Sequence, residues 1–172
     1  MTQPLVGILV GSASDLELAQ KATDILLQLE IPFEVGIASA HRTPEDVMGY
    51  ARKAQSRGLR VLIGIAGLSA ALPGVMAAHT LLPVLGVPVS GSGELGGLDA
   101  LLSITQMPPG VPVGSVGVNG AKNAALLAAR IIALENKETR ENLGKWVQHQ
   151  AEQVAKSRKE LHPSAAVPKD AF

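Results

Sequence analysis

Short apolar runs alternate with segments of helical periodicity along most of this chain, and this alternation is its strongest structural constraint. The helical segments repeat apolar residues every three or four positions, as at Ala19, Ala22 and Ile25. The run at residues 5–10 is continuous and that at 60–66 is nearly so, which is typical of parallel strands buried on both faces. The runs cover residues 5–10, 33–38, 60–66, 84–87 and 113–118. The pattern predicts an α/β fold, a doubly wound, five-stranded parallel sheet of the flavodoxin or Rossmann type with helices on both faces.

Local signals predict where several of these elements begin and end. Thr43 can cap the second helix, Pro44 suits its first position, and Gly58 suits its C-terminal cap. We expect the third helix to run to about Leu81 and the fourth strand to stop before Pro88. Each of the first four strands is then followed by a loop and a helix, as right-handed crossovers require.

The last segment of the chain differs in character from the rest. Residues 137–161 are charged, and their apolar side chains form one thin stripe. The stripe consists of Leu143, Trp146, Val147, Val154 and Leu161. We expect a helix that leaves the domain and packs on a neighbouring subunit, with a frayed tail after His162. The predicted organisation is an α/β catalytic domain over residues 1–136 and a C-terminal helix and tail over 137–172, with no separate domain.

Composition and charge exclude several classes of protein. Fifteen basic and fifteen acidic residues give a formal net charge of zero, so we expect no nucleic acid or anionic membrane as partner. The chain has no cysteine, which excludes disulfides and thiolate metal sites. No apolar run reaches about 18 residues, and the N-terminus lacks the pattern of a signal peptide. We therefore expect a soluble, cytoplasmic protein.

Four loops carry the polar residues that could bind a ligand. They span residues 11–15, 39–43, 67–74 and 90–97, and each follows one of the first four strands. The carboxyl ends of parallel strands meet at one edge of the sheet, where ligands bind in open α/β folds. The loops should therefore form a single site.

The first two loops have the chemistry of a nucleotide site. Ser12, Ser14 and nearby backbone N–H groups at a helix N-terminus suit a phosphate, and Arg42 adds a charged fork for the same anion. Asp15 suits a ribose hydroxyl. The alternative is that Ser14 or Asp15 only caps the first helix.

His41 is the candidate acid or base, because it lies beside Arg42 at the ligand-binding edge. The other histidines are interpreted as structural or as surface residues, His79 inside the third helix and His149 and His162 in the charged segment. No second histidine or carboxylate has the spacing of a metal ligand set, so we predict no metal site.

Two other functions are weakly supported. Residues 91–96 match G-x-G-x-x-G, but they follow the fourth strand rather than the first, and residues 111–118 contain no acid for a ribose. A hydrolase triad of Ser12 or Ser39 with His41 and Asp15 lacks the G-x-S-x-G nucleophile turn. A dinucleotide site and a hydrolase are both disfavoured.

In their order and spacing, the motifs resemble one family, the N5-carboxyaminoimidazole ribonucleotide mutases of purine biosynthesis and the related aminoimidazole ribonucleotide carboxylases. The resemblance covers residues 5 to about 134. Its motifs are Gly11-Ser12-Ala13-Ser14-Asp15, Ser39-Ala40-His41-Arg42-Thr43-Pro44 and residues 82–89, 99–104, 106–113 and 121–129.

The resemblance implies transfer of a carboxylate from the exocyclic nitrogen of an aminoimidazole ribonucleotide to carbon four, through carbon dioxide. It implies no cofactor, metal or ATP, and it gives His41 the proton transfers. It also implies that Ser12, Asp15 and Arg42 bind ribose and phosphate, and we add Ser14, Ser39 and Ser69 as substrate-binding candidates. Family members assemble as homo-octamers, often with the C-terminal helix on a neighbour.

The third loop departs from the family pattern and leaves alternatives open. Common bacterial mutases usually have the sequence Ala-Gly-Gly-Ala-Ala-His-Leu-Pro-Gly in this loop, whereas this chain has Ala66-Gly67-Leu68-Ser69-Ala70-Ala71-Leu72-Pro73-Gly74. The direct carboxylases, which use free carbon dioxide, resemble this chain in the serine at position 69 and the alanine at position 71. We expect the mutase reaction. The alternatives are direct carboxylation and a non-catalytic nucleotide-binding module that lost activity through Ala71.

Overall fold

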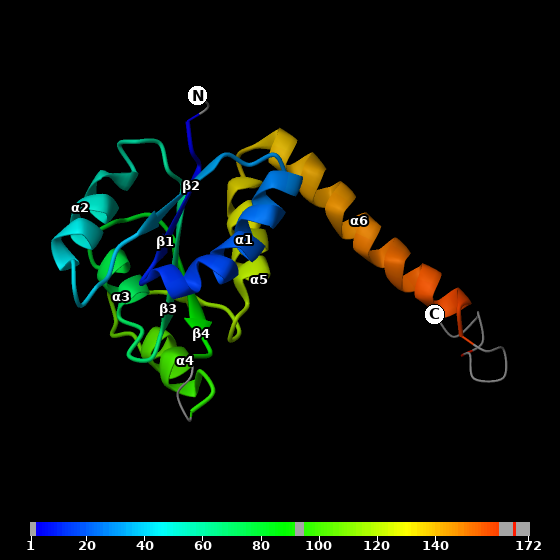
Figure 1. Cartoon of the computed structure of the whole chain (residues 1–172). Helices are drawn as coiled ribbons and strands as arrows, with labels where there is room; N and C mark the ends of the chain where they lie inside the picture. Colours follow the sequence, from blue (N-terminus) through cyan, green and yellow to red (C-terminus); the bar gives the residue numbers. More distant parts are fainter. Residues whose placement is uncertain (1–2, 92–94, 162–166, 168–172) are drawn as a thin grey trace.

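A computed structural model describes residues 3–91, 95–161 and 167 of the chain (Figure 1). A five-stranded parallel sheet forms its centre, in the order β2-β1-β3-β4-β5. The strands are β1 (Val6–Val10), β2 (Phe33–Ile37), β3 (Val61–Gly67), β4 (Val84–Val89) and β5 (Gly114–Ser115). This is the flavodoxin-like order, in which the chain reverses direction across the sheet between β1 and β3. The predicted fold is confirmed.

Helices cover both faces of the sheet. The helices are η1 (Ala13–Asp15), α1 (Leu16–Gln28), α2 (Pro44–Ala54), α3 (Leu72–Ala77), α4 (Leu98–Thr105), α5 (Ala121–Ile132) and α6 (Lys137–Lys159). One face packs against α1 and α5, and the other against α2, α3 and α4 (Figure 1). None of the described helices is long and apolar enough to cross a bilayer.

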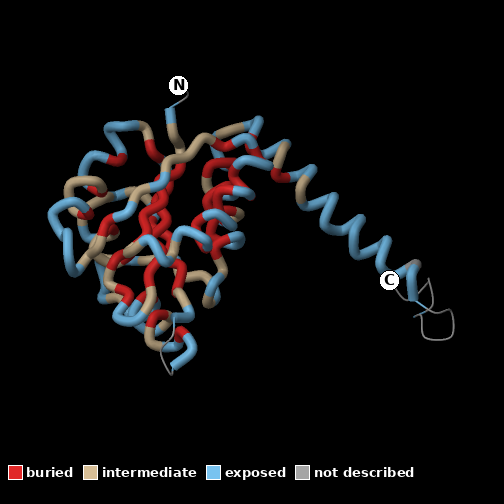
Figure 2. Tube along the Cα trace, viewed as in Figure 1, coloured by how far each residue is buried: buried red, intermediate tan, exposed pale blue. Residues whose placement is uncertain are grey.

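The core follows from the apolar runs of the central strands β1, β3 and β4. Along β1, Ile8 packs in the cluster with α1 and α5, whereas its neighbour Leu9 packs in the cluster with α2 and α3. Successive side chains of a strand point to opposite faces, so a strand covered on both sides must be apolar throughout. The buried residues accordingly concentrate on the sheet and the helix faces turned towards it (Figure 2).

The ends of α2 and α3 differ from the prediction. The regular α2 helix stops at Ala54, yet Gly58 has φ of +89° and its N–H donates to the Gln55 carbonyl, which makes it the glycine of a C-terminal capping turn. Helix α3 stops at Ala77 rather than Leu81. The His79 ring donates from Nδ1 to the Val75 carbonyl at 2.9 Å and replaces the backbone donor that would continue the helix. His79 is therefore structural but lies in a turn.

Two strand boundaries were also predicted wrongly. β4 continues through Pro88 to Val89, and β5 is confined to Gly114–Ser115 instead of residues 113–118. Proline lacks a backbone N–H and normally interrupts a ladder. The carbonyl of Pro88 accepts from Asn119 on the side where β5 has already ended, so no ladder bond is lost.

α6 is anchored to the domain only through its first turns. Leu143 is buried, Trp146 Nε1 donates to Gln28 Oε1 at 3.3 Å, and Asn142 Nδ2 donates to the Leu29 carbonyl at 3.4 Å. Beyond Trp146 the helix extends away from the domain, and its residues 147–158 are exposed (Figures 1 and 2). The remainder of the predicted stripe is therefore uncovered in this chain. The tail predicted after His162 lies outside the described residues, except for position 167.

Candidate active site

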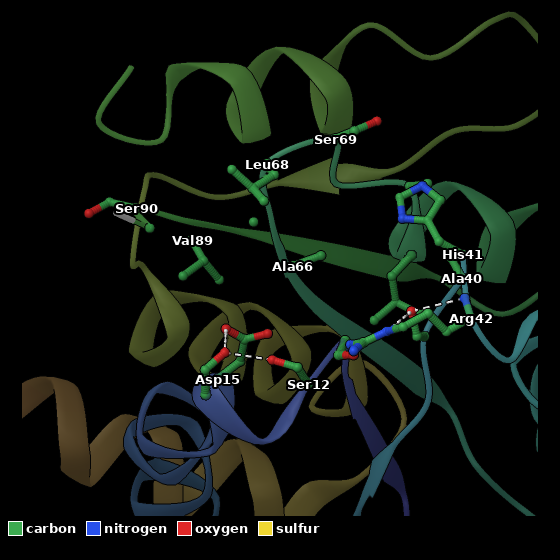
Figure 3. Close-up of a pocket in the computed structure, with 17 residues that line it drawn as sticks. Ser12, Asp15, Ala40, His41, Arg42, Ala66, Leu68, Ser69, Val89 and Ser90 are labelled. Carbon is green, nitrogen blue, oxygen red and sulfur yellow. Dashed lines mark hydrogen bonds between the residues drawn. The ribbon is translucent and has the colours of Figure 1, made fainter. Parts of the chain in front are cut away.

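The four predicted loops meet around one cavity of about 590 Å³ (Figure 3). It lies where the chain reverses direction across the sheet, since the loops after β1 and β3 both contribute to its wall. All seven residues singled out from the sequence line it: Ser12, Ser14, Asp15, Ser39, His41, Arg42 and Ser69. Sequence reasoning missed Ala66 and Val89, which are ends of apolar strands and carry no polar signal. Residues 92–94, within the predicted fourth loop and its G-x-G-x-x-G match, lie outside the described residues.

The first loop holds its polar side chains in a chain of hydrogen bonds. Ser12 Oγ lies 2.5 Å from Ser14 Oγ, and Ser14 Oγ donates to Asp15 Oδ1 at 3.2 Å. Because Ser14 has one proton and gives it to the carboxylate, Ser12 must be the donor in its contact with Ser14. Ser12 therefore presents its oxygen lone pairs to a ligand. The capping alternative is wrong, because neither Ser14 nor Asp15 caps α1 with its side chain.

The second loop is closed on Ser39. Thr43 occupies the N-cap position of α2 as predicted, but its hydroxyl makes no cap bond. Instead Thr43 Oγ1 accepts from the Ser39 N–H at 3.0 Å, and the Thr43 N–H donates to the Ser39 carbonyl at 2.8 Å. The resulting tight turn presents His41 and Arg42 at its tip.

Arg42 is held from two sides. Its Nη2 donates to the Gly11 carbonyl at 3.1 Å, and its Nε donates to Ser39 Oγ at 3.4 Å. Three of its five N–H donors have no partner among the described residues and are available for an anion. A planar, oriented guanidinium of this kind suits bidentate binding of a phosphate.

His41 stands on the wall of the cavity across from Asp15 (Figure 3). Its side chain is exposed, and neither ring nitrogen has a hydrogen-bond partner within the described part of the chain. Both nitrogens are thus free to exchange protons with a bound substrate.

The third loop and the ends of β3 and β4 together form an apolar wall. Ala66 and Val89 lie beside Leu68 (Figure 3), and Leu72 also lines the cavity. Leu68 has φ of +55°, the left-handed region, which costs an L-residue other than glycine about 1–2 kcal/mol. Ala71, at the end of the same loop, offers no acid or base.

The arrangement combines three chemical capacities. An anion fits against Arg42 and the first loop, protons can be exchanged at His41, and the apolar wall suits a ligand part that is not hydrated. No group of three or more histidine, aspartate and glutamate side chains that could hold a metal ion occurs among residues 3–91, 95–161 and 167.

Comparison with known proteins agrees with this geometry. The family described as AIR carboxylase matches residues 5–153. The N5-carboxyaminoimidazole ribonucleotide mutase of Pyrococcus abyssi is 52% identical over 143 residues, which is 83% of this chain and 82% of that protein. The phosphoribosylaminoimidazole carboxylase of Schizosaccharomyces pombe is 55% identical over 130 residues, but these are only 23% of that protein. The crystal structure of Treponema denticola PurE superposes with a TM-score of 0.80 at 33% identity, covering 92% of this chain and 98% of that one.

Proposed function

The chain belongs to the AIR carboxylase family, and from this premise we infer that it is an N5-carboxyaminoimidazole ribonucleotide mutase of purine biosynthesis. The observation that carries this function is the identity of about half of the residues with mutases over most of both chains. The cavity supports it, because it offers a phosphate end at Arg42, a proton carrier at His41 and an apolar wall.

The substrate's phosphate and ribose would occupy the side of the cavity formed by the first two loops. Arg42 and the backbone N–H groups around Ser12 hold the phosphate, and Asp15 accepts a hydrogen bond from a ribose hydroxyl. Ser12 Oγ accepts a hydrogen bond from a donor group of the ligand, since its own proton is donated to Ser14 Oγ. Ser39 acts mainly by fixing Arg42.

The reaction proceeds in two balanced steps. First the bond between the exocyclic nitrogen and the carboxylate breaks, carbon dioxide leaves, and protonated His41 supplies the proton that the nitrogen takes up. Carbon four then attacks the carbon dioxide, a carbon–carbon bond forms, and the neutral His41 removes the proton from carbon four. An imidazole suits both transfers because it donates and accepts protons near neutral pH. The net result is the movement of one carboxylate.

A second candidate function, direct carboxylation, is favoured by two observations. Ser69 and Ala71 stand in the third loop, where the sequence shares features with direct carboxylases, and relatives named phosphoribosylaminoimidazole carboxylase are 48–55% identical to this chain. In a direct carboxylase the carbon dioxide would enter from solvent and meet aminoimidazole ribonucleotide in the same cavity.

Supplying each substrate separately tests the function. In bicarbonate-free buffer the enzyme should convert N5-carboxyaminoimidazole ribonucleotide to the 4-carboxy product, measured by chromatography against an enzyme-free blank. Product formed only from aminoimidazole ribonucleotide with bicarbonate would establish the direct carboxylase instead. Ribonucleotide binding without any turnover would establish the non-catalytic module.

We also propose that the protein assembles as a homo-octamer with α6 packed on a neighbouring subunit. The support is the exposed stripe of α6, where Val147 and Val154 are 44% and 56% exposed although the helix is regular. An apolar stripe on a helix that extends beyond its own domain is expected to be covered in the assembly.

A further inference from the structure

The conformation and exposure of Leu68 do not contribute to the stability of the folded domain. Its backbone is in the left-handed region, where glycine would be relaxed, and its side chain is 62% exposed. The residue thus gains neither a favourable backbone nor a buried side chain in the free protein. Backbone strain at the wall of a ligand cavity is expected to have a role when the ligand is bound.

The position of Leu68 is fixed by the sheet. It follows directly after β3, whose last residue Gly67 is paired with Val89 on β4. Figure 3 places Leu68 across the cavity from Ser12 and Asp15, on the side opposite to the predicted phosphate and ribose site.

The side of the cavity near Leu68 is lined mainly by small and apolar residues. Figure 3 places Ala66, Val89 and the two serines Ser69 and Ser90 near Leu68, and Ala71 and Leu72 also line the cavity. A neutral, weakly solvated molecule such as carbon dioxide cannot be retained by a charge or by strong hydrogen bonds. It can be retained only by walls that leave it no path to solvent.

We propose that Leu68 is the closure residue of the carboxyl-transfer side of the cavity. When the ribonucleotide is bound, the leucine side chain covers the gap above the imidazole and keeps the released carbon dioxide from exchanging with that in solvent. This role rests on the proposed mutase function and concerns only the interval after the nitrogen–carbon bond breaks and before the carbon–carbon bond forms. It makes Leu68 a determinant of carboxyl retention, separate from the proton transfers of His41.

The proposal is tested by isotope exchange in the complete protein. Purified enzyme converts unlabelled N5-carboxy substrate in ¹³C-bicarbonate with carbonic anhydrase, and the labelled fraction of the 4-carboxy product is read by mass spectrometry. Leu68→Ala keeps the strained backbone, whereas Leu68→Gly also relieves the strain. Both variants should raise the labelled fraction about tenfold, which corresponds to a decrease of about 1.4 kcal/mol in the barrier to escape of carbon dioxide. Leu68→Met, which preserves the apolar volume, should remain near the wild-type value. Leu81→Ala, at a leucine that is 95% exposed and outside the cavity lining, is the matched control.

The possible outcomes test the proposed role of Leu68 separately from the mutase function. If the wild type makes product with little label and the Leu68 variants do the same, the closure is overturned and the mutase stands. A wild type that fails to convert the N5-carboxy substrate, or whose product is fully labelled, overturns both. If Leu68→Ala instead changes only the mass of the assembly in sedimentation, the leucine belongs to a subunit contact, and the closure is likewise overturned.

Discussion

Arg42 Nη2 donates a hydrogen bond to the carbonyl oxygen of Gly11 at 3.1 Å, joining two loops that are 31 residues apart in the chain. The bond sets the guanidinium against the loop after β1, where the helix N-terminus of the first crossover begins. An anion bound there meets a fixed charge and backbone N–H groups together. Preorganisation of this kind lowers the entropy lost on binding.

Arg42→Lys should weaken ribonucleotide binding. A lysine ammonium cannot satisfy the Gly11 carbonyl and Ser39 Oγ while also presenting a planar fork to a phosphate. We expect the Kd measured by calorimetry to rise about tenfold or more, which corresponds to one lost hydrogen bond to a charged group. Arg52→Lys, the same change at an exposed position of α2 outside the cavity lining, should leave Kd unaltered; equal affinities of the two variants would contradict the role of Arg42.

Ser14→Ala should change how Ser12 meets the ligand. Without Ser14, Asp15 loses a donor and the proton of Ser12 loses its acceptor, so Ser12 no longer presents only lone pairs. We expect KM to rise about three- to tenfold, the effect of one neutral hydrogen bond, with a smaller change in kcat. Ser56→Ala, at an exposed serine beyond the end of α2, is the control. A wild-type KM in Ser14→Ala would show that the hydrogen-bond chain has no part in binding.

His41→Asn should abolish turnover and preserve binding. Asparagine retains polarity and approximate size but cannot take up and return a proton, so kcat should fall by about 10²–10⁴. Calorimetric binding of the ribonucleotide should persist, because Arg42 and the first loop are untouched. His149→Asn on α6 controls for the loss of a surface histidine. A fully active His41→Asn enzyme would remove His41 from the mechanism.

The loops of the site were predictable because their placement depends on topology. Once the apolar runs are assigned to parallel strands, the loops after β1 to β4 must share an edge, and Ser12, His41 and Ser69 meet there although they are far apart in sequence. The pairing of individual side chains was not predictable. Thr43 has the residue type and position of an N-cap, but its hydroxyl bonds to Ser39 in a loop whose shape no local pattern specifies.

The wrong element boundaries have the same cause. The sequence around Pro88 signals a strand end, and the strand continues only because β5 is too short to require a donor at that position. Helix α3 ends early because the ring of His79 takes up a backbone carbonyl. Each outcome depends on a partner that local propensity does not contain. The cytoplasmic location, the division at residue 136 and the roles of the site residues stay predictions.

The assembly can be tested through the exposed stripe of α6. Val154→Asp places a charge on the face proposed to contact a neighbour, and burying it there without a partner is costly, so the octamer should dissociate in sedimentation analysis. Ala155→Asp adds the same charge one position further along the exposed helix, off the stripe, and should leave the mass unaltered. An intact octamer in Val154→Asp would place the stripe outside the subunit contacts.

Tyr50, on α2, lies beside the ion pair of Glu34 and Arg57. Its hydroxyl and Glu34 Oε1 are both buried without a hydrogen-bond partner among the described residues, while Arg57 pairs with Glu34 and lies 5.7 Å from the centre of the Tyr50 ring. Burial, and then the neighbouring Glu34, raise the pKa of Tyr50 far above its usual value, and Arg57 opposes this only partly. The folded protein therefore retains the proton of the Tyr50 hydroxyl at pH values at which the unfolded chain loses it.

Tyr50→Phe should make the protein less sensitive to alkali. Because the folded pKa is raised, the stabilisation from the neutral phenol is complete below the unfolded pKa of about 10 and declines as the pH rises above it. The free energy of unfolding of the wild type should fall by up to about 1.4 kcal/mol per pH unit more steeply than that of the variant in this range. Lysine titration is common to both proteins and cancels in the difference.

Denaturant unfolding from pH 7 to 11 measures the free energy of unfolding of both proteins. Since Tyr50 is the chain's single tyrosine, ultraviolet absorbance follows its ionisation directly. Near pH 7 the two proteins should be similarly stable, because the lost hydroxyl had no partner. Parallel stability curves up to pH 11 would mean that the phenol ionises as readily in the folded protein as in the unfolded chain.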